Sequence, residues 1–244
     1  MLKRKAQITV FVIIAIVIVG LIAGYFILRN NTKSSSEIPA DVKPVYDFVQ
    51  DCIKRTGTDA LIRIGDRGGY LFITPDVVSV NNNVPYYLYK TQTLIPSRSL
   101  IESSFNILFK NELEFCILNF KKFEKDYNIT HKLNKITTSI ENDSLVISLD
   151  YPISVSKGSS TYEFNNFKFE KPARIESFLK MSENIVAQKQ KYPSGICLNC
   201  LYDLKSEYNA GIDLTDYGNS TIFILRDDNF KINNKGYEWS FAIK

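Results

Sequence analysis

Residues 8–28 form an uninterrupted uncharged segment in which Thr9 is the only conventionally polar side chain. A helix of this length extends about 31 Å, which is enough to cross the hydrocarbon core of a bilayer. The apolar region of a cleaved secretory signal is only about 7–15 residues long and precedes an A-x-A-like site, and neither feature is present here. The sequence therefore predicts a membrane-spanning helix near the N-terminus.

Basic residues flank this segment unequally. Three precede it in residues 1–7, whereas Arg29 and Lys33 follow it. Because positive charge is retained on the cytoplasmic side, this difference favours an N-terminus inside the cytosol. We expect a single-pass protein of the cytoplasmic membrane, with its C-terminal domain outside.

The basic head ends in Ala6-Gln7 and leads directly into the apolar run. This arrangement resembles an archaeal class III (type IV pilin-like) signal peptide, and the start Gln7-Ile8-Thr9-Val10-Phe11 resembles singly anchored surface proteins of small-genome archaea. The resemblance covers about the first 28 residues. It implies cleavage between Ala6 and Gln7 by a prepilin peptidase, with the apolar helix retained as an anchor or assembly stalk. Phe11 stands where many bacterial pilins place a glutamate.

The remainder divides into a short linker and a large domain. Residues 29–40 include the polar, Ser-rich stretch NNTKSSSEI, which is typical of a flexible tether. Five of the 30 basic residues and one of the 26 acidic residues precede Asp41, so the domain at 41–244 is formally neutral. Because a nucleic-acid partner requires a basic surface, we expect none.

Periodicity in residues 41–244 predicts an α+β domain of antiparallel strand meanders packed with several helices, because helices and strands occur in separate runs. Gly57 is expected to end or kink the first helix, and Ser99 with Glu102 resembles a capping box. The expected helices are residues 41–55, 58–64, 97–127, 174–190 and 197–208. The expected strands are residues 70–74, 84–90, 136–141, 144–156, 162–170, 212–214, 220–226 and 237–243.

All four cysteines lie in the expected outer domain. Outside the cytosol an even number permits two disulfides, with three connectivities. We expect Cys52 to pair with Cys116, because each lies on the apolar face of a predicted helix, and Cys197 to pair with Cys200. The alternative is four buried free thiols.

Cys197-Leu198-Asn199-Cys200 also has the spacing of a redox-active pair opening a helix, which defines one alternative function, an extracytoplasmic thiol oxidoreductase. A structural disulfide is the simpler interpretation, because no strand immediately precedes the pair. His131 is the only histidine and is expected in an exposed polar turn, so neither a zinc site nor histidine-dependent catalysis is expected. We expect no cofactor and no catalytic residues.

The sequence thus predicts a non-enzymatic cell-surface protein that serves in adhesion, envelope structure or partner binding. The second alternative is a pilin-like subunit assembled through its apolar helix. Expected partners are the lipid bilayer and other envelope or pilus-like proteins, with prepilin peptidase if the head is processed. The sequons for N-glycosylation are Asn30, Asn128, Asn142 and Asn219.

Overall fold

The computed structural model describes residues 18, 20, 38–72, 79–80, 83–232 and 235–244. The chain divides into two compact units, of which Ala40–Lys244 is the larger. The predicted spanning segment and the Ala6–Gln7 bond fall outside the described residues, apart from residues 18 and 20. Within the described part of the chain, no helix is both long enough and apolar enough to traverse a bilayer.

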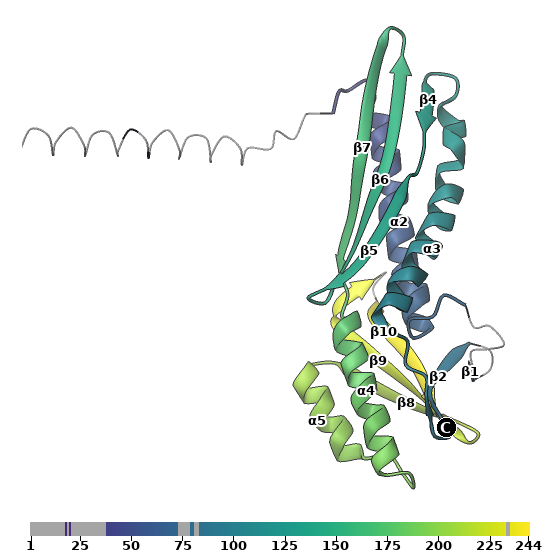
Figure 1. The fold of residues 1–244 in the computed structure, drawn as a ribbon, viewed down its shortest axis with the longest axis vertical. Helices are drawn as coiled ribbons and strands as arrows, with labels where there is room; N and C mark the ends of the chain where they lie inside the picture. The colour runs from purple at the N-terminus through teal and green to yellow at the C-terminus, as the bar shows by residue number, and fades with distance from the viewer. Residues whose placement is uncertain (1–17, 19, 21–37, 73–78, 81–82, 233–234) are drawn as a thin grey trace, which may run out of the picture. The chain divides into compact units, whose positions relative to one another are not determined.

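The larger unit confirms the predicted α+β class, with two sheets and four α-helices in its described part (Figure 1). Its helices are α2 (Lys43–Asp66), α3 (Arg98–Ile117), α4 (Ile175–Lys191) and α5 (Leu198–Tyr208), with a 3₁₀ segment η1 (Leu118–Phe123). The strands are β1 (Ser79–Val80), β2 (Val84–Tyr89), β3 (Gln92–Thr93), β4 (Asn128–His131), β5 (Lys135–Glu141), β6 (Ser144–Lys157), β7 (Ser160–Pro172), β8 (Gly211–Tyr217), β9 (Ser220–Ile232) and β10 (Lys235–Ile243).

The first predicted break is wrong, because α2 continues through Gly57 to Asp66 as one helix. Its buried face, which includes Val45, Val49 and Ile53, contacts both sheets, at β7 and at β10. Two glycines on this face permit close approach. A Cβ on Gly57 would collide with the ring of Phe169, and one on Gly65 would lie 2.3 Å from the carbonyl oxygen of Glu238. Gly57 therefore serves packing rather than helix termination.

Strands β4 to β7 form a four-stranded antiparallel sheet in which β6 pairs with all three others. Helices α2 and α3 run along one face of this sheet (Figure 1). Strand β6 alternates regularly, with Leu145, Ile147 and Leu149 buried. Asn142 and Asp143, with φ of 47° and 57°, form the two-residue turn between β5 and β6.

Strand β7 departs from simple alternation. The pairing of β6 with β7 shifts by one residue between Asp150 and Ile153. Such a bulge reverses which positions of the partner strand face the core. Sequence alternation places Phe164 and Phe167 on opposite faces, yet both rings pack against Tyr46 of α2, with centroids at 5.1 and 5.9 Å.

The second sheet has the order β1-β2-β10-β9-β8, with β3 paired to β2. Most of its pairs are antiparallel, but β2 and β10 are parallel, which the expected meander did not include. The predicted strand at residues 70–74 is absent from its described part, since residues 70–72 are irregular. Helices α4 and α5 lie beside this sheet (Figure 1).

Aromatic residues fill the centre of this second sheet. Tyr87, Phe241 and Phe223 stack in a row across β2, β10 and β9, with centroid separations of 4.6 and 5.3 Å. Trp239 Nε1 donates to Tyr87 Oη at 3.0 Å, and Tyr87 Oη donates to the carbonyl of Gly68 at 2.7 Å. This buried chain of hydrogen bonds joins the turn after α2 to the sheet.

Helix α3 starts where the sequence predicted but ends earlier. Ser97 is its N-cap, and its Oγ accepts from Leu100 N at 3.2 Å, so the capping box predicted at Ser99 is absent. Glu102 does not complete a capping box; it accepts a hydrogen bond from Ile140 N of β5 instead. The helix ends at Ile117, ten residues before the predicted end, where the backbone becomes left-handed.

Candidate functional site

Both expected disulfides are present, Cys52–Cys116 and Cys197–Cys200, and none of the four cysteines is free. The two bonds have different surroundings. Cys52–Cys116 joins α2 to α3, with the Cys52 side only 2% exposed. Arg55 donates a hydrogen bond to Cys116 Sγ at 2.7 Å on the outer side of this bond.

The two disulfides also differ in the length of chain that they close. Cys52 and Cys116 are 64 positions apart, and a loop of that size corresponds to a stabilisation of about 4 kcal/mol in the chain-entropy description. Cys197 and Cys200 are 3 positions apart, for which the same relation gives less than about 2 kcal/mol. A contribution to stability through the unfolded chain therefore explains the presence of Cys52–Cys116 better than that of Cys197–Cys200.

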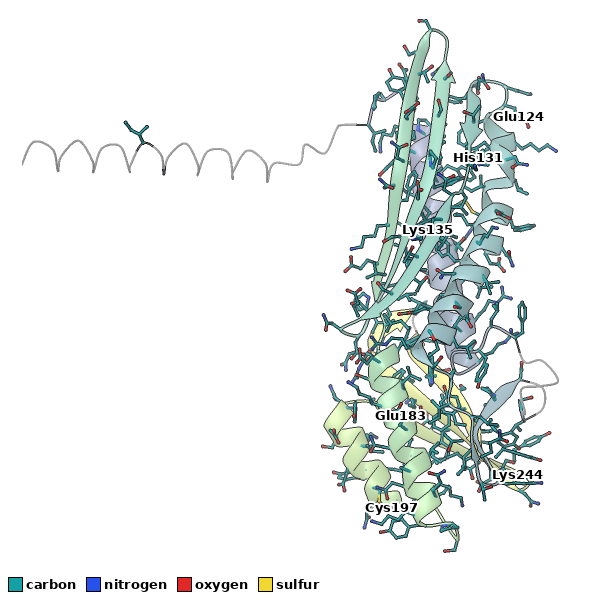
Figure 2. The ribbon with its side chains drawn as sticks, in the orientation of Figure 1. Glu124, His131, Lys135, Glu183, Cys197 and Lys244 are labelled. Carbon is teal, nitrogen blue, oxygen red and sulfur yellow. A yellow bond between two sulfur atoms is a disulfide. The ribbon has the colours of Figure 1, made fainter. Side chains whose placement is uncertain are left out.

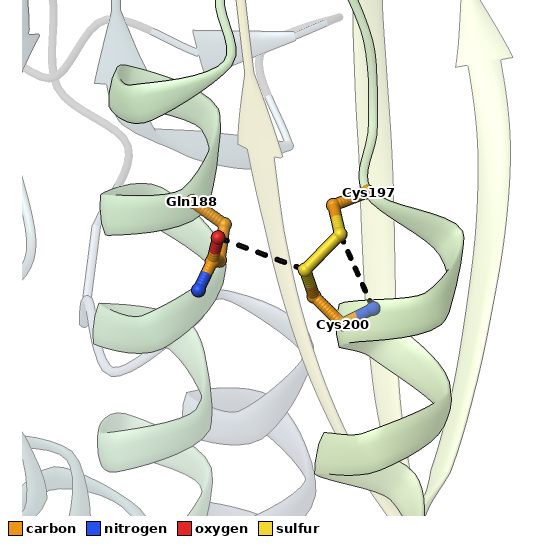
Figure 3. The surroundings of a disulfide bond; sticks show 3 residues. All are labelled: Gln188, Cys197 and Cys200. Atoms are coloured by element: carbon orange, nitrogen blue, oxygen red, sulfur yellow. Dashed lines mark hydrogen bonds between the residues drawn. A yellow bond between two sulfur atoms is a disulfide. The ribbon is translucent and has the colours of Figure 1, made fainter.

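Cys197 and Cys200 open helix α5, as the sequence predicted. Cys197 is the N-cap residue, and its Sγ accepts a hydrogen bond from Cys200 N at 3.3 Å. Cys200 Sγ lies 3.6 Å from Oε1 of Gln188 on α4, as Figure 3 shows. Both cysteines are half-buried.

A pocket adjoins this disulfide between α4, α5 and the β9–β10 edge, with about 450 Å³ of empty space, part of which is open to solvent. Its apolar wall comes from five residues: Ile185, Ile196, Leu201, Phe223 and Ile243. Cys197, Gln188 and Lys189 line it as well. Lys189 Nζ donates to the carbonyl of Pro193 at 2.9 Å, which holds its ammonium near the start of α5.

A second candidate site begins where α3 ends. Leu118, Asn119 and Phe120 have φ of 45°, 51° and 58°, so three consecutive non-glycine residues are left-handed. Each such residue carries an energetic cost of about 1–3 kcal/mol, and such strain is concentrated at functional sites. The ring of Phe120 is buried against His131, with centroids 4.9 Å apart, and this packing holds the strained turn in place.

His131 is not in the exposed turn that the sequence predicted. It is the half-buried last residue of strand β4 in the four-stranded sheet, and it lies far from Cys197 (Figure 2). Its Nδ1 lies 3.0 Å from Tyr151 Oη. Burial lowers the pKa of His131, and burial together with the charge of Glu114 raises the pKa of Tyr151. A neutral imidazole accepting the phenol hydrogen is consistent with both directions.

These groups line a groove of about 940 Å³ of empty space. We call it the His131 groove; it is formed by Lys110, Leu113, Glu114, Ile117, Leu118, Asn119, His131, Lys132, Leu133 and Tyr151. Leu118 is 59% exposed at its edge. Four of these ten residues are apolar and six are polar or charged, so the groove offers both apolar contact and hydrogen-bonding groups. Sequence reasoning missed it, because no glycine marks the left-handed turn.

The remaining predicted sites are dispersed. Asn128, Asn142 and Asn219 are exposed, whereas Asn30 lies outside the described residues. Across the described ranges, no three His, Cys, Asp or Glu side chains are grouped as metal ligands. No family model, curated protein or solved structure that was compared with the chain matches it, so its site must be judged from its own geometry.

Proposed function

We propose that this chain is a membrane-anchored cell-surface protein. Residues 8–28 span the cytoplasmic membrane with residues 1–7 inside, and the domain at 41–244 faces the outside. The observation that carries this proposal is that all four cysteines are joined in disulfides. Disulfides persist in oxidising compartments and are rare in the cytosol, so they support an outside location beyond the uncharged segment alone.

The location is tested by adding protease to intact cells that express the full chain. We expect digestion of residues 41–244 without lysis, and no free thiols when the protein is denatured in an alkylating reagent. Protection of the domain in intact cells, followed by its digestion after lysis, would overturn the proposal. Four free thiols in material alkylated before lysis would do the same.

The role that the geometry supports is binding of an envelope partner through the His131 groove. The strained residues support this role, because a left-handed Leu118 caps α3 but Asn119 and Phe120 continue this unfavourable conformation beyond the cap. Polar groups such as Lys110, Glu114 and Lys132 beside apolar Leu118 provide both affinity and orientation for a protein surface.

Binding is tested by placing a photo-reactive side chain at Leu118 in the full-length protein on cells. The matched control is Thr161, an exposed position in the β6–β7 hairpin. We expect one discrete cross-linked product from position 118 and none from position 161. The absence of any discrete product at position 118 would contradict a binding role for the groove.

The mass of the cross-linked product distinguishes a pilin-like subunit from a singly anchored protein that binds a different partner. A product of twice the chain's mass, together with a mature N-terminus at Gln7, would support the pilin-like alternative, in which copies assemble through the apolar helix. A product with a different envelope protein, on a chain that keeps residues 1–7, would support a singly anchored receptor or structural protein. Mass spectrometry of the N-terminal peptide gives the processing result.

A further inference from the structure

We propose that Cys197–Cys200 is a thiol–disulfide exchange site for cysteine-containing polypeptides. Cys197 forms the mixed disulfide, and the adjoining pocket takes an apolar side chain next to the substrate's cysteine. This activity goes beyond partner binding at the His131 groove and uses a separate part of the domain (Figure 2). It rests on the geometry of the disulfide together with that of the pocket.

The first argument concerns which sulfur an incoming thiolate reaches. Cys197 lines the pocket together with Gln188, whereas Cys200 is not among the lining residues and its Sγ lies against Gln188 Oε1 (Figure 3). A substrate sulfur entering through the pocket therefore meets Cys197. Cys200 is left as the resolving cysteine, with Gln188 Oε1 at 3.6 Å to accept its S–H once the bond is reduced.

The second argument concerns the charge on Cys197 after reduction. Its Sγ accepts from Cys200 N at the first turn of α5, where the partial positive charge of the helix favours an anion. Lys189 adds a full positive charge in the same pocket, held by the carbonyl of Pro193. Stabilising the thiolate of Cys197 favours its release from a mixed disulfide, which makes the oxidised pair a donor of disulfides.

The third argument concerns the substrate class. The pocket beside Cys197 has an apolar wall of five side chains. A free tripeptide thiol such as glutathione has no apolar side chain to fill this space. An unfolded or extended polypeptide with Phe or Leu beside its cysteine does, so we assign polypeptide thiols as substrates.

The chemical step balances as a transfer of two electrons. A substrate thiolate attacks Cys197 Sγ, the Cys197–Cys200 bond breaks, and Cys200 leaves with the electron pair and takes a proton. A second substrate thiolate then attacks the mixed disulfide at the substrate sulfur and releases Cys197 as a thiolate. The substrate dithiol becomes a disulfide, and the pair becomes a dithiol that a low-molecular-weight disulfide reoxidises.

The roles are tested with full-length protein in detergent, using Cys200→Ser and Cys197→Ser as a matched pair. The probe is a short peptide in which Phe precedes a cysteine activated as a mixed disulfide with glutathione. We expect Cys200→Ser to form the protein–peptide disulfide at least about tenfold faster than Cys197→Ser, because only Cys197 faces the pocket. Equal rates for the two variants, both folded by circular dichroism, would overturn the assignment.

A measurement on the unmodified chain makes the test independent of these variants. The protein is equilibrated in glutathione buffers of graded potential, and each disulfide is read by alkylation and peptide mass spectrometry. We expect Cys197–Cys200 to be reduced while Cys52–Cys116 stays intact. Reduction of both bonds together, only as the protein unfolds, would show that the pair is structural and would overturn the proposal.

Further variants test the role of the Lys189 charge. Lys189→Glu should lower the equilibrium ratio of reduced to oxidised Cys197–Cys200 on the order of threefold. Lys189→Arg keeps the positive charge and should leave this ratio unchanged. The matched control is Lys191→Glu, at an exposed position of the same helix, which should leave the ratio unchanged.

The pocket is tested with the probe peptide. Replacing its Phe by Glu should slow the reaction of Cys200→Ser. Equal rates for both peptides would contradict the role given to the pocket.

Discussion

The ring of Phe169 in β7 occupies the position that a Cβ on Gly57 in α2 would need, with three ring atoms only 2.7 Å from that position. The helix and the four-stranded sheet approach closely at this point because residue 57 has no side chain. Further along the same helix, Gly65 allows a similar approach to β10. The two glycines let one helix pack against both sheets.

Gly57→Ala is expected to lower the free energy of unfolding by about 1–3 kcal/mol, because the added methyl group overpacks the contact with Phe169. The loss should exceed the gain of about 1 kcal/mol that alanine gives over glycine within a helix. Denaturant unfolding measures it. Gly195→Ala is the control, since a Cβ there meets nothing within 4 Å, and it should change stability by less than about 0.5 kcal/mol. Full additivity of Gly57→Ala with Phe169→Leu would contradict the contact.

Two fully buried tyrosines of the second sheet should respond oppositely to loss of their hydroxyl groups. Tyr87 Oη bonds both Trp239 Nε1 and the carbonyl of Gly68, so Tyr87→Phe leaves two buried groups unpaired. We expect it to destabilise the protein by about 1–3 kcal/mol. Tyr237 Oη has no hydrogen-bond partner among the described residues, so Tyr237→Phe should leave stability unchanged or raise it. Equal losses in denaturant unfolding would contradict this difference.

The two disulfides should contribute unequally to stability. Removing Cys52–Cys116 by paired substitution to Ala should lower the free energy of unfolding by about 4 kcal/mol, because it opens a 64-position loop and leaves a cavity at the buried Cys52. The same change at Cys197 and Cys200 should lower it by less than about 2 kcal/mol. The comparison uses denaturant midpoints of the two double variants. A larger loss at Cys197–Cys200 would reverse the interpretation of the pair.

Stability should fall as the pH is lowered through the titration of His131. Burial lowers the pKa of this imidazole in the folded chain below its ordinary value of 6.5. In the interval between the folded and unfolded pKa values the unfolded chain binds more protons, so acidification favours unfolding there. His131→Asn keeps an acceptor for Tyr151 Oη without this titration, so its thermal midpoint should depend less on pH between about 7.5 and 5.5. An identical pH profile for the two proteins would contradict a buried neutral His131.

The burial of Asp66 gives a pH effect of the opposite sign. Its carboxyl pKa is raised above the ordinary 3.8, mainly by desolvation. The folded chain therefore binds the proton at higher pH than the unfolded chain, and this group favours the folded state as the pH falls through its titration. Because His131→Asn leaves Asp66 unchanged, the difference between the pH profiles of the two proteins isolates the contribution of His131.

Much of the secondary structure could be predicted from side-chain period. The helices α4 and α5 and the strands β5 and β6 fall where the sequence places them, because each has one apolar face and a clear turn at its end. The disulfide pairing followed from the same reasoning. Cys52 and Cys116 lie on the inner faces of two helices, so packing those helices brings the two sulfurs together.

The errors arise where tertiary contacts override local signals. Gly57 reads as a helix end, but its neighbour in space is Phe169, which no local pattern reveals. The bulge that brings Phe164 and Phe167 to one face is set by pairing with β6, not by β7 alone. The parallel partner of β2 comes from β10, at the other end of the domain sequence.

The candidate sites divide in the same way. The CxxC disulfide is visible as a spacing, so the sequence predicts its pairing and its place at the start of a helix. Its pocket is formed by side chains of β9 and β10 together with α4, which only the fold brings together. The His131 groove depends on three left-handed residues without glycine, and these are stabilised by the burial of Phe120 against His131.

The parallel pairing of Tyr86 in β2 with Ala242 in β10 determines when the second sheet can be completed during synthesis. During synthesis β2 is made well before β10, the strand that covers its parallel edge. A nascent chain that has not yet reached residue 235 therefore carries an open edge on β2 and cannot complete this sheet. A chaperone that shields this early edge strand would determine how much of the chain reaches its folded form.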